Sequence, residues 1–479
     1  MEYLRMNNKR ALFISIHILL LLIYLWFYES NPNSISSNLK MMGVFVWTQF
    51  IISVVGWKRI TGRVFVPYII FLLAAYIFCV GQSFLEVFNL VDEKRSVYNM
   101  CSASEIYRAE VYSLLFLASF HIGALVDYRK KYSETKINDS AKTKLVEYSA
   151  IKNIGRIYIY ISFIPFIIEN YVKYSMVSAY GYGGLYMNKG IPLWGLITLL
   201  SDFFIPGVLC VLLTSRPNSN RQRNILLFFA AIIFFIMYCG GRSQGVVLVA
   251  VTLLYYQNHV KPISKKGWIL LCVGGFFFVY MLSVISHLRS GSRDSYVEAI
   301  VNYKAEAGSN PFFETISEMG GSIYPMARTM TLVPSTNEEY RYGTTYLYAL
   351  SSLIPNVGFW ERHPAAVKAN LAEWLMEKDR LTYSPAYSIV AEAYINFGIA
   401  GFIVMFILGV YFSRVLNIES GSKNKILTFL VAIIFTYMSL QMVRNCFFGV
   451  VRTLAYYILP IYWYVSYKVN KYRLRHPVQ

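Results

Sequence analysis

The sequence predicts an all-α polytopic membrane protein, and two observations carry this prediction. Hydrophobic residues make up 56% of the 479 residues and charged residues only 15%, whereas a soluble globular protein carries roughly 25% charged residues. The apolar residues also form long runs without a polar face, such as LFISIHILLLLIYLWF and ILLFFAAIIFFIMYC. Each run approaches the ~20 residues that cross a bilayer as an α-helix, and neither shows the period-two alternation of a barrel strand.

Twelve segments are apolar enough to be predicted as transmembrane helices. The first follows a basic start, and the sequence ESNPNS after it does not fit a signal-peptide cleavage site, so we expect an uncleaved span. The predicted spans are 11–28, 41–57, 64–82, 107–126, 154–172, 191–214, 224–239, 244–258, 267–286, 386–413, 426–443 and 447–467.

Lys and Arg residues fix the orientation of these helices, because cytoplasmic loops carry an excess of both. The termini and connections on one face hold 27 Lys and Arg residues, and the short connections on the other face hold 9. We therefore expect a multi-pass membrane protein with both termini in the cytoplasm. The chain then divides into helices one to nine (1–286), a large extracytoplasmic loop (287–385), and helices ten to twelve with a cytoplasmic tail (386–479).

The net charge of +19 does not indicate nucleic-acid binding. Most basic residues lie on the predicted cytoplasmic rim, where topology and anionic lipid favour them. The 287–385 loop is nearly neutral, with 9 basic and 11 acidic residues. The cytoplasmic connections are short and contain no Walker or Gly-rich nucleotide motif. We therefore expect any chemistry at the outer face or within the membrane, with no nucleic acid and no nucleotide as the direct energy source.

Motifs for metal or covalent catalysis are missing from the sequence. The six cysteines have no CxxC spacing, and the outer loops contain no HxxxH, HExxH or DxD pattern, so we expect no metal and no cofactor. No GxSxG nucleophile elbow occurs either. The long loop nevertheless carries structure of its own, because SYVEAIVNYKAEA (295–307) and PAAVKANLAEWLMEK (364–378) have the spacing of amphipathic helices. Such a loop indicates a lid or small domain rather than a flexible connection.

Several arginines are predicted at or near the outer face. Arg242 lies in CGGRSQG, where glycines allow close approach of the backbone to a ligand and a helix N-terminus follows, which favours anions. An arginine near the hydrocarbon boundary is costly unless it is paired or functional; the alternative is a snorkelling or capping role. Arg289 and Arg293 directly follow a span, where a solvated helix end is the alternative. Arg328 and Arg444 complete the set.

Carboxylates are the second group of candidates. Glu318 precedes a glycine pair in ETISEMGGSIYP, and Glu392 lies within a predicted span. Ser388, Glu392 and Asn396 follow one another at i+4 spacing, which places them on one helix face, and a carboxylate there should face the protein interior. Asp202 in LLSDFFIP is another intramembrane carboxylate. For each acid, a buried helix-to-helix hydrogen bond is the structural alternative.

Substrate contacts are expected from a smaller set of side chains. His287 ends a span beside Arg289, where a structural or solvated histidine is the alternative. Outer tyrosines have rings that could stack on sugars, and Tyr324 and Tyr387 are the candidates we select. Most aromatic residues of a membrane protein, however, belong to lipid interfaces and helix packing.

Three sequence features together resemble the O-antigen polymerase (Wzy) family of bacteria. They are the GGRS turn, the FFETISEMGGSIYPMARTM segment with Pro334 and YGTTYLYALSSLIP after it, and the SIVAEAYINFGIAG span. The resemblance by motif covers roughly residues 225–410, and the first 220 residues match in hydropathy alone. The arrangement is also similar to the related O-antigen ligases and to polytopic glycosyltransferases of the GT-C type.

The resemblance implies a reaction and roles for the candidate residues. An oligosaccharide repeat unit on undecaprenyl pyrophosphate would be displaced at its anomeric carbon by a sugar hydroxyl of a second lipid-linked unit. Arginines would then hold the diphosphate leaving group, since guanidinium suits phosphate, and a carboxylate would orient or deprotonate the hydroxyl. We predict Arg242, Arg289, Arg328 and Arg444 for the pyrophosphate; Glu318, Glu392 and Arg289 as catalytic residues; and Tyr324, Tyr387, Asn396 and His287 for substrate binding.

Membrane lipid, a chain-length regulator and a flippase are the further partners that this reaction implies. Two other functions remain open. An O-antigen ligase would share the large outer loop. A transporter or flippase of lipid-linked sugars would suit twelve spans, but such proteins usually show two related halves, and no repeat is visible in this sequence.

Overall fold

The computed structural model describes residues 2–30, 35–128, 141–180, 191–239, 242–288, 310–356, 359–381, 385–416, 426–444 and 446–476. Within these ranges the chain forms helices joined by turns and contains no β-strand, which confirms the predicted all-α class. Eight helical segments of the described residues are long and apolar enough to cross a membrane, as expected of a multi-pass membrane protein.

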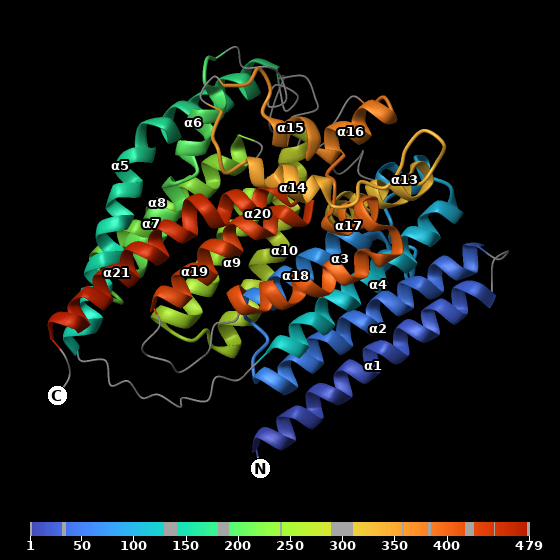
Figure 1. The fold of residues 1–479 in the computed structure, drawn as a ribbon, viewed down its shortest axis with the longest axis horizontal. Coiled ribbons are helices and arrows are strands. Elements are labelled where there is room, and N and C mark those ends of the chain that lie inside the picture. The colour runs from blue at the N-terminus through green and yellow to red at the C-terminus, as the bar shows by residue number, and fades with distance from the viewer. Residues whose placement is uncertain are drawn as a thin grey trace.

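The four N-terminal helices pack side by side (Figure 1). The first of their three connections is short, and the third carries two 3₁₀ turns. The last of the four starts with a capping box, in which Ser102 Oγ accepts from the Glu105 N–H and the Glu105 carboxylate accepts from the Ser102 N–H, so two N–H groups of the helix start are satisfied. The helices are α1 (Glu2–Ser30), α2 (Ile35–Thr61), α3 (Pro67–Glu86) and α4 (Ala103–Asp127).

A later helix, α18 (Gly401–Leu416), completes this half of the molecule by packing along α4. Two glycines make the contact close. A Cβ atom at Gly123 would overlap the carbonyl of Phe406, and one at Gly409 would overlap the carbonyl of Phe120. Small residues allow transmembrane backbones to approach in this way, so α4 and α18 form a closely packed pair.

The middle of the chain, drawn from blue-green to yellow-green in Figure 1, forms the second half together with the C-terminal helices, drawn in red. α5 runs for 40 residues with Pro165 inside it, and it packs against α6, α7 and α21. The helices of this half are α5 (Ala141–Tyr180), α6 (Trp194–Ser201), α7 (Phe204–Leu213), α8 (Asn220–Tyr238), α9 (Arg242–Tyr255), α10 (Lys265–Leu288), α19 (Ile426–Ser439), α20 (Phe448–Arg452) and α21 (Leu459–Arg475).

Eight of the twelve predicted spans coincide with the eight candidate membrane helices, namely 11–28, 41–57, 64–82, 107–126, 154–172, 191–214, 224–239 and 386–413. Of the other four, 267–286 lies within α10, a helix of 24 residues. Helices α9 and α19 are shorter, with only 14 residues each. The predicted span 447–467 is divided into α20, a π-helical turn η8 (Thr453–Ile458) and α21. A count of twelve crossings therefore stays a prediction.

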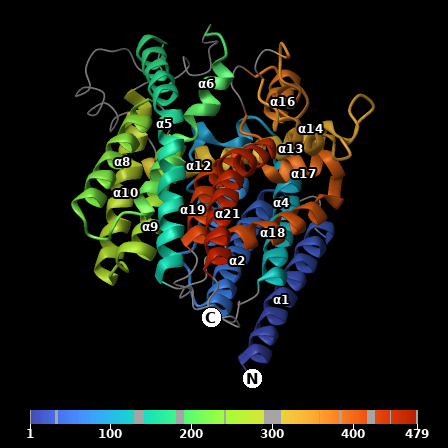
Figure 2. The same cartoon turned by 60° about the vertical axis from the view of Figure 1, so that its left-hand side comes forward.

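The described part of the predicted outer loop packs onto one end of the bundle, and both termini lie at the opposite end (Figure 2). α12 contacts α3, α13 contacts α4, and α14 contacts α20. The predicted single helix 364–378 is in fact two, because the Asn370 side chain accepts from the Glu373 N–H and caps a new helix there. The elements are α12 (Pro311–Gly320), η5 (Gly321–Ile323), α13 (Tyr324–Leu332), α14 (Thr344–Ser351), α15 (Pro364–Lys368) and α16 (Leu371–Lys378).

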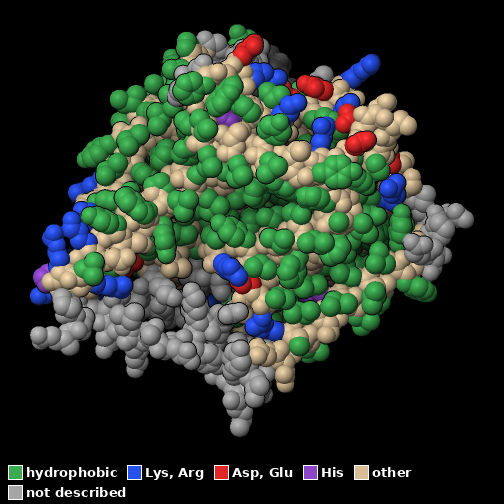
Figure 3. Space-filling view, in the orientation of Figure 1, with side chains coloured by type: hydrophobic (Ala, Val, Ile, Leu, Met, Phe, Trp, Pro, Cys, Tyr) green, Lys and Arg blue, Asp and Glu red, His purple; other side chains and the backbone are tan. Residues whose placement is uncertain are grey.

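Apolar side chains cover much of the face shown in Figure 3, and most of the charged ones gather toward its two ends. Large hydrophobic residues are exposed on several helices, including Trp26, Tyr160, Phe234 and Leu270. Monomeric soluble proteins rarely expose contiguous apolar areas of this kind. The surface is therefore suited to lipid around the helices and to water at both ends.

Candidate active site

The centre of the site is the inner face of α17 (Ile389–Phe397), the first half of the last candidate span. Ser388 caps this helix by accepting from the Ala391 N–H at 3.3 Å. Glu392 and Asn396 follow at i+4 spacing, and all three side chains are buried. The predicted shared face and the predicted inward orientation of the Glu392 carboxylate are thus confirmed.

Both oxygens of the Glu392 carboxylate accept hydrogen bonds from other parts of the chain. Thr345 Oγ1, in α14, donates to Oε1 at 2.9 Å. The backbone N–H of Phe447, just before α20, donates to Oε2 at 2.6 Å. Glu392 therefore ties helix α14 and the backbone that immediately precedes α20 to α17. A buried carboxylate with two such donors is held in one place.

Asn396 extends the same network toward the outer loop. Its amide donates to Thr345 Oγ1 and to the Glu392 carbonyl, both at 2.8 Å. Its Oδ1 accepts from the Gly343 N–H at 3.0 Å, and the backbone N–H of Arg341 donates to the Ile395 carbonyl at 2.9 Å. Asn396 thus fixes residues 341–345 on α17, and its side chain is fully buried.

Three arginines around this network keep a buried donor that lacks a hydrogen-bond acceptor among the described residues. In each of them, Arg341, Arg444 and Arg452, the donor is the Nε–H group. Arg444 lies in η7 (Leu440–Arg444), and its guanidinium carbon is 5.2 Å from the centre of the Phe78 ring. Arg452 ends α20, close enough to Asp202 to interact electrostatically. Buried polar groups without partners cost about 1–3 kcal/mol each, so these donors are candidates for an anionic ligand.

Arg328, in contrast, is already paired. Its Nε and one terminal nitrogen donate to the two carboxylate oxygens of Asp379 at 3.0 and 2.8 Å, and its other nitrogen donates to Glu105 Oε1 at 3.3 Å. Tyr324 also donates to Asp379. This fork-shaped contact joins α13, α16 and α4. The structure therefore gives Arg328 and Tyr324 partners within the protein, and their predicted contacts with pyrophosphate and sugar stay predictions.

The titration behaviour of this network follows from the same contacts. Hydrogen bonds from its guanidinium to Asp379 raise the pKa of Arg328. Burial alone would raise the pKa of Asp379, but the hydrogen bonds from Arg328 and Tyr324 outweigh burial, and this pKa lies below its ordinary value. Burial and the bond to Asp379 raise the pKa of Tyr324. The network therefore holds an ionised pair and a neutral tyrosine at neutral pH.

Glu318 lies in α12, half-buried, two residues before a tight contact with α3. A Cβ atom at Gly320 would overlap the backbone nitrogen of Gln82. Gln82 Nε2 donates to the Ser317 carbonyl at 2.8 Å, and Asp92 N donates to Ser317 Oγ at 3.0 Å. Gly320, the first of the two glycines after Glu318, therefore serves helix packing, and α12 is held against α3.

The remaining predicted residues fall into two groups. Tyr387 is fully buried, with its hydroxyl 2.7 Å from Thr329 Oγ1, so its ring leaves no face open to a sugar in this structure. Arg289 and Arg293 lie outside the described residues. For Arg242, which begins α9, and for His287 in α10, the helix position is described and the side chain is not. Their predicted roles therefore stay predictions.

Asp202 makes a buried hydrogen bond between helices, which is the structural alternative considered above for this carboxylate. It lies where α6 meets α7, and Tyr457 OH donates to its Oδ2 at 3.2 Å. Tyr457 OH also lies 3.3 Å from the Leu199 carbonyl. On α5, Lys173 pairs with Glu169 at 2.7 Å. Asp202 thus links the α6–α7 joint to η8 beside Arg452.

Sequence inspection missed the partners that define the site. They are Thr345, which lies in the YGTTYLYALSSLIP segment without having been singled out there, and Asp379, Arg341 and Arg452, which lie in no recognisable motif. For Arg452 the signal was present, because an arginine inside an apolar segment (FFGVVRTLAYY) is costly without a role. No cluster of three His, Cys, Asp or Glu side chains suitable for a metal occurs in the described part of the chain.

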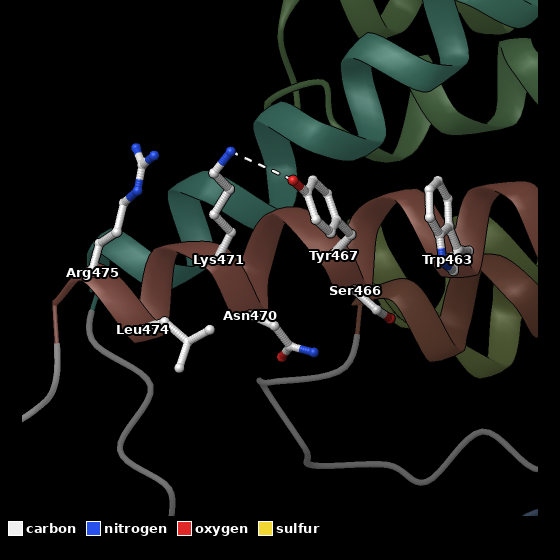
Figure 4. A pocket seen from close by; sticks show the side chains of 7 residues that line it. All are labelled: Trp463, Ser466, Tyr467, Asn470, Lys471, Leu474 and Arg475. Carbon is white, nitrogen blue, oxygen red and sulfur yellow. Dashed lines mark hydrogen bonds between the residues drawn. The ribbon is translucent and has the colours of Figure 1, made fainter.

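A surface hollow of about 560 Å³ lies away from this site, along the C-terminal half of α21 (Figure 4). Trp463, Tyr467, Lys471 and Arg475 line it, and Lys471 Nζ is 3.5 Å from Tyr467 OH. Aromatic and basic side chains at the end of a membrane helix are typical of the lipid headgroup region. We therefore do not assign the reaction to it.

These features define a class: a multi-pass helical membrane protein with a buried carboxylate and neighbouring arginines where the segments between α10 and α17 meet the bundle. The chain belongs to the family described as O-antigen polysaccharide polymerase Wzy, whose profile matches residues 11–472. No curated protein and no solved structure matches the chain. Membership implies a glycosyltransferase-type polymerase acting on a lipid-linked oligosaccharide in the membrane.

Proposed function

We propose that this protein polymerises oligosaccharide repeat units carried on undecaprenyl pyrophosphate at the outer face of the bacterial cytoplasmic membrane, as O-antigen or capsular polysaccharide. The family match over nearly the whole chain is the observation that carries the proposal. A sugar hydroxyl of the acceptor unit forms a bond to the anomeric carbon of the donor. The bond from that carbon to the diphosphate breaks, undecaprenyl pyrophosphate leaves, and the hydroxyl proton passes to a carboxylate.

Arginines are the groups that stabilise the leaving diphosphate in this proposal. Arg444 and Arg452 flank Phe447, whose N–H is fixed by Glu392, and each retains a buried Nε–H without an acceptor among the described residues. Arg242 and Arg289 join them as proposed from the sequence. In known enzymes, each hydrogen-bond donor positioned for the charge that develops in the transition state lowers the activation free energy by about 2.7–4 kcal/mol.

The two candidate carboxylates take different roles. Glu392 is a positioning residue, because both of its oxygens are occupied by Thr345 and Phe447. Glu318 is half-buried at the end of α12, and we assign to it the orientation or deprotonation of the acceptor hydroxyl. Arg328, Tyr324, Tyr387 and Asn396 hold the outer segments on the bundle.

The proposed topology places both termini in the cytoplasm and α12–α16 outside. It is supported by the excess of Lys and Arg on the terminal side and by the position of the termini at the end of the bundle opposite to α13–α16 (Figure 2). Twelve crossings, a GT-C-like architecture, and a chain-length regulator and flippase as partners belong to the same proposal.

Deletion of the gene and analysis of the surface glycolipid test this function. A polymerase mutant carries single repeat units on the finished lipid, and the full-length protein restores the long ladder. A flippase mutant would instead accumulate precursor that faces the cytoplasm, and a ligase mutant would leave long polymer on the undecaprenyl carrier. Either of the last two outcomes rejects the proposal.

A further inference from the structure

Helices α1–α4 contain a second buried polar network that takes no part in the site above. Most of its members are inaccessible to solvent, and several have polar atoms without a hydrogen-bond partner among the described residues. Most buried polar groups in proteins are satisfied by protein or by ordered water, so a concentration of such atoms within two neighbouring helices points to bound water. The atoms are Gln49 Oε1, Trp57 Nε1, Tyr107 OH, Glu110 Oε2, Ser113 Oγ and His121 Nε2.

Two histidines form the end of the network nearer the chain termini. His17 Nε2 lies 3.0 Å from Ser53 Oγ, and His121 Nδ1 lies 2.8 Å from Tyr68 OH. The two imidazole rings are 5.0 Å apart between centroids. Both histidines are fully buried. Both nitrogens of His17 have partners, because its Nδ1 lies 2.7 Å from the Phe13 carbonyl. His121 Nε2 has none among the described residues, so a water molecule bound to it would complete this end of the network.

The middle and far end of the network continue along the same helices. Ser53 Oγ donates to the backbone carbonyl of Gln49 at 2.7 Å. The Tyr76 hydroxyl accepts from Gln49 Nε2 at 2.8 Å and also interacts with the Ser53 side chain. At the far end, Ser83 donates to Glu110. Ser113, one helical turn from Glu110 toward His121, is fully buried with an unpartnered Oγ.

The network extends through the membrane-embedded part of these helices. Glu110 and His121 are eleven residues apart on α4, which is about 16 Å at ~1.5 Å per residue and about half of the ~30 Å hydrocarbon core. Ionisable residues within a membrane helix are expensive, and chains of Glu and His are a known form of proton relay. Buried water with two to four polar partners can fill the gaps between them.

We propose that the α1–α4 bundle holds a proton path from Glu110 through Ser113, Tyr76 and Ser53 to the His17–His121 pair. Each group accepts a proton on one side and releases one on the other, so only O–H and N–H bonds change. The titratable groups that face Glu110 are Glu86 of α3, Tyr98 of η2 (Val97–Asn99) and Tyr107 of α4. Those that face His121 are His17 of α1 and Tyr68 of α3. The path is independent of the proposed polymerisation.

Proton flux through the full-length protein tests the path. The purified chain is placed in vesicles that contain a pH-sensitive dye, and an outward pH gradient is imposed with valinomycin and potassium to clamp the voltage. We expect the wild type to dissipate the gradient at least fivefold faster than vesicles without protein. Glu110→Gln, which keeps an acceptor for Ser83, and His121→Gln should both fall to within twofold of the protein-free rate.

Matched variants separate conduction from folding and from polymerisation. Ser119→Ala lies on α4 outside the path, because its hydroxyl donates to the Leu115 carbonyl, and should conduct like the wild type. Arg444→Ala should conduct normally even though its polymerisation fails. Conduction by Glu110→Gln or His121→Gln at the wild-type rate, or a wild-type rate equal to that of empty vesicles, overturns the proposal.

Discussion

Replacing Glu392 is the perturbation whose effect the structure defines most closely. Glu392→Ala removes the acceptors of the Thr345 hydroxyl and the Phe447 N–H, which lie 2.9 and 2.6 Å from the carboxylate. A buried donor left without an acceptor costs about 1–3 kcal/mol, so the two together cost about 2–6 kcal/mol. Glu392→Gln keeps one acceptor oxygen and places an NH₂ group against the other donor, so it should lose about 1–3 kcal/mol.

The free energy of unfolding in detergent, measured by titration with a denaturing detergent, provides the assay. A double-mutant cycle with Thr345→Val isolates the Glu392–Thr345 bond, and we expect a coupling energy of about 0.5–3 kcal/mol. Glu361→Gln, an exposed carboxylate in the outer segment, is the matched control and should leave stability unchanged. Polymer length in cells should shorten with Glu392→Gln, because the turn between Arg444 and Arg452 loses its fixed position.

Two results would refute this reasoning about Glu392. One is a Glu392→Ala variant as stable as the control. The other is additive behaviour of the Glu392 and Thr345 variants, which would mean that the two side chains do not interact in the folded protein. Normal polymer from a correctly inserted Glu392→Ala variant would separately reject its positioning role in the reaction.

Three further predictions concern the arginines, the ion pair and the helix contact. Arg444→Ala and Arg452→Ala should each lower the initial polymerisation rate about 10²–10³-fold at normal membrane levels, and wild-type rates from both would remove them from the site. Because the pKa of Asp379 lies below its ordinary value, its stabilising contribution is present above the unfolded pKa of about 3.9 and is lost as pH falls through the folded pKa. The stability difference between wild type and Asp379→Asn, followed by thermal unfolding, should therefore be constant from pH 7 to 5 and shrink below about pH 4; a constant difference at all pH values would contradict the pairing. Gly320→Val should lower the thermal midpoint because its side chain overlaps Gln82, and an unchanged midpoint would show that α12 does not pack there.

Part of this site followed from local sequence pattern. The i+4 spacing of Ser388, Glu392 and Asn396 placed them on one helix face, and the cost of a lipid-facing carboxylate placed that face inward. Their partners could not be predicted in the same way, because Thr345 and Phe447 lie 47 and 55 residues from Glu392 in the chain. Such pairings depend on how helices pack, which one sequence does not specify.

Arg328 shows the same limit from the opposite side. Its role as a pyrophosphate ligand stays a prediction, whereas its partners in the fold, Asp379 and Glu105, are 51 and 223 residues away in the chain and could not be predicted from one sequence. The prediction of twelve membrane spans was limited for another reason. The hydropathy pattern predicted the apolar segments of α9, α19 and η8. It does not indicate helix length or π-helical turns, and these make the segments differ from simple spans.

Polymerisation by the purified protein tests the central claim most directly. The full-length chain is reconstituted in vesicles with the undecaprenyl-pyrophosphate-linked repeat unit of its own cell as the only sugar substrate. The account predicts a ladder of products that grow by one repeat unit, with one undecaprenyl pyrophosphate released for each linkage and no requirement for nucleotide. Movement of the intact repeat unit across the membrane without any new glycosidic bond would contradict it.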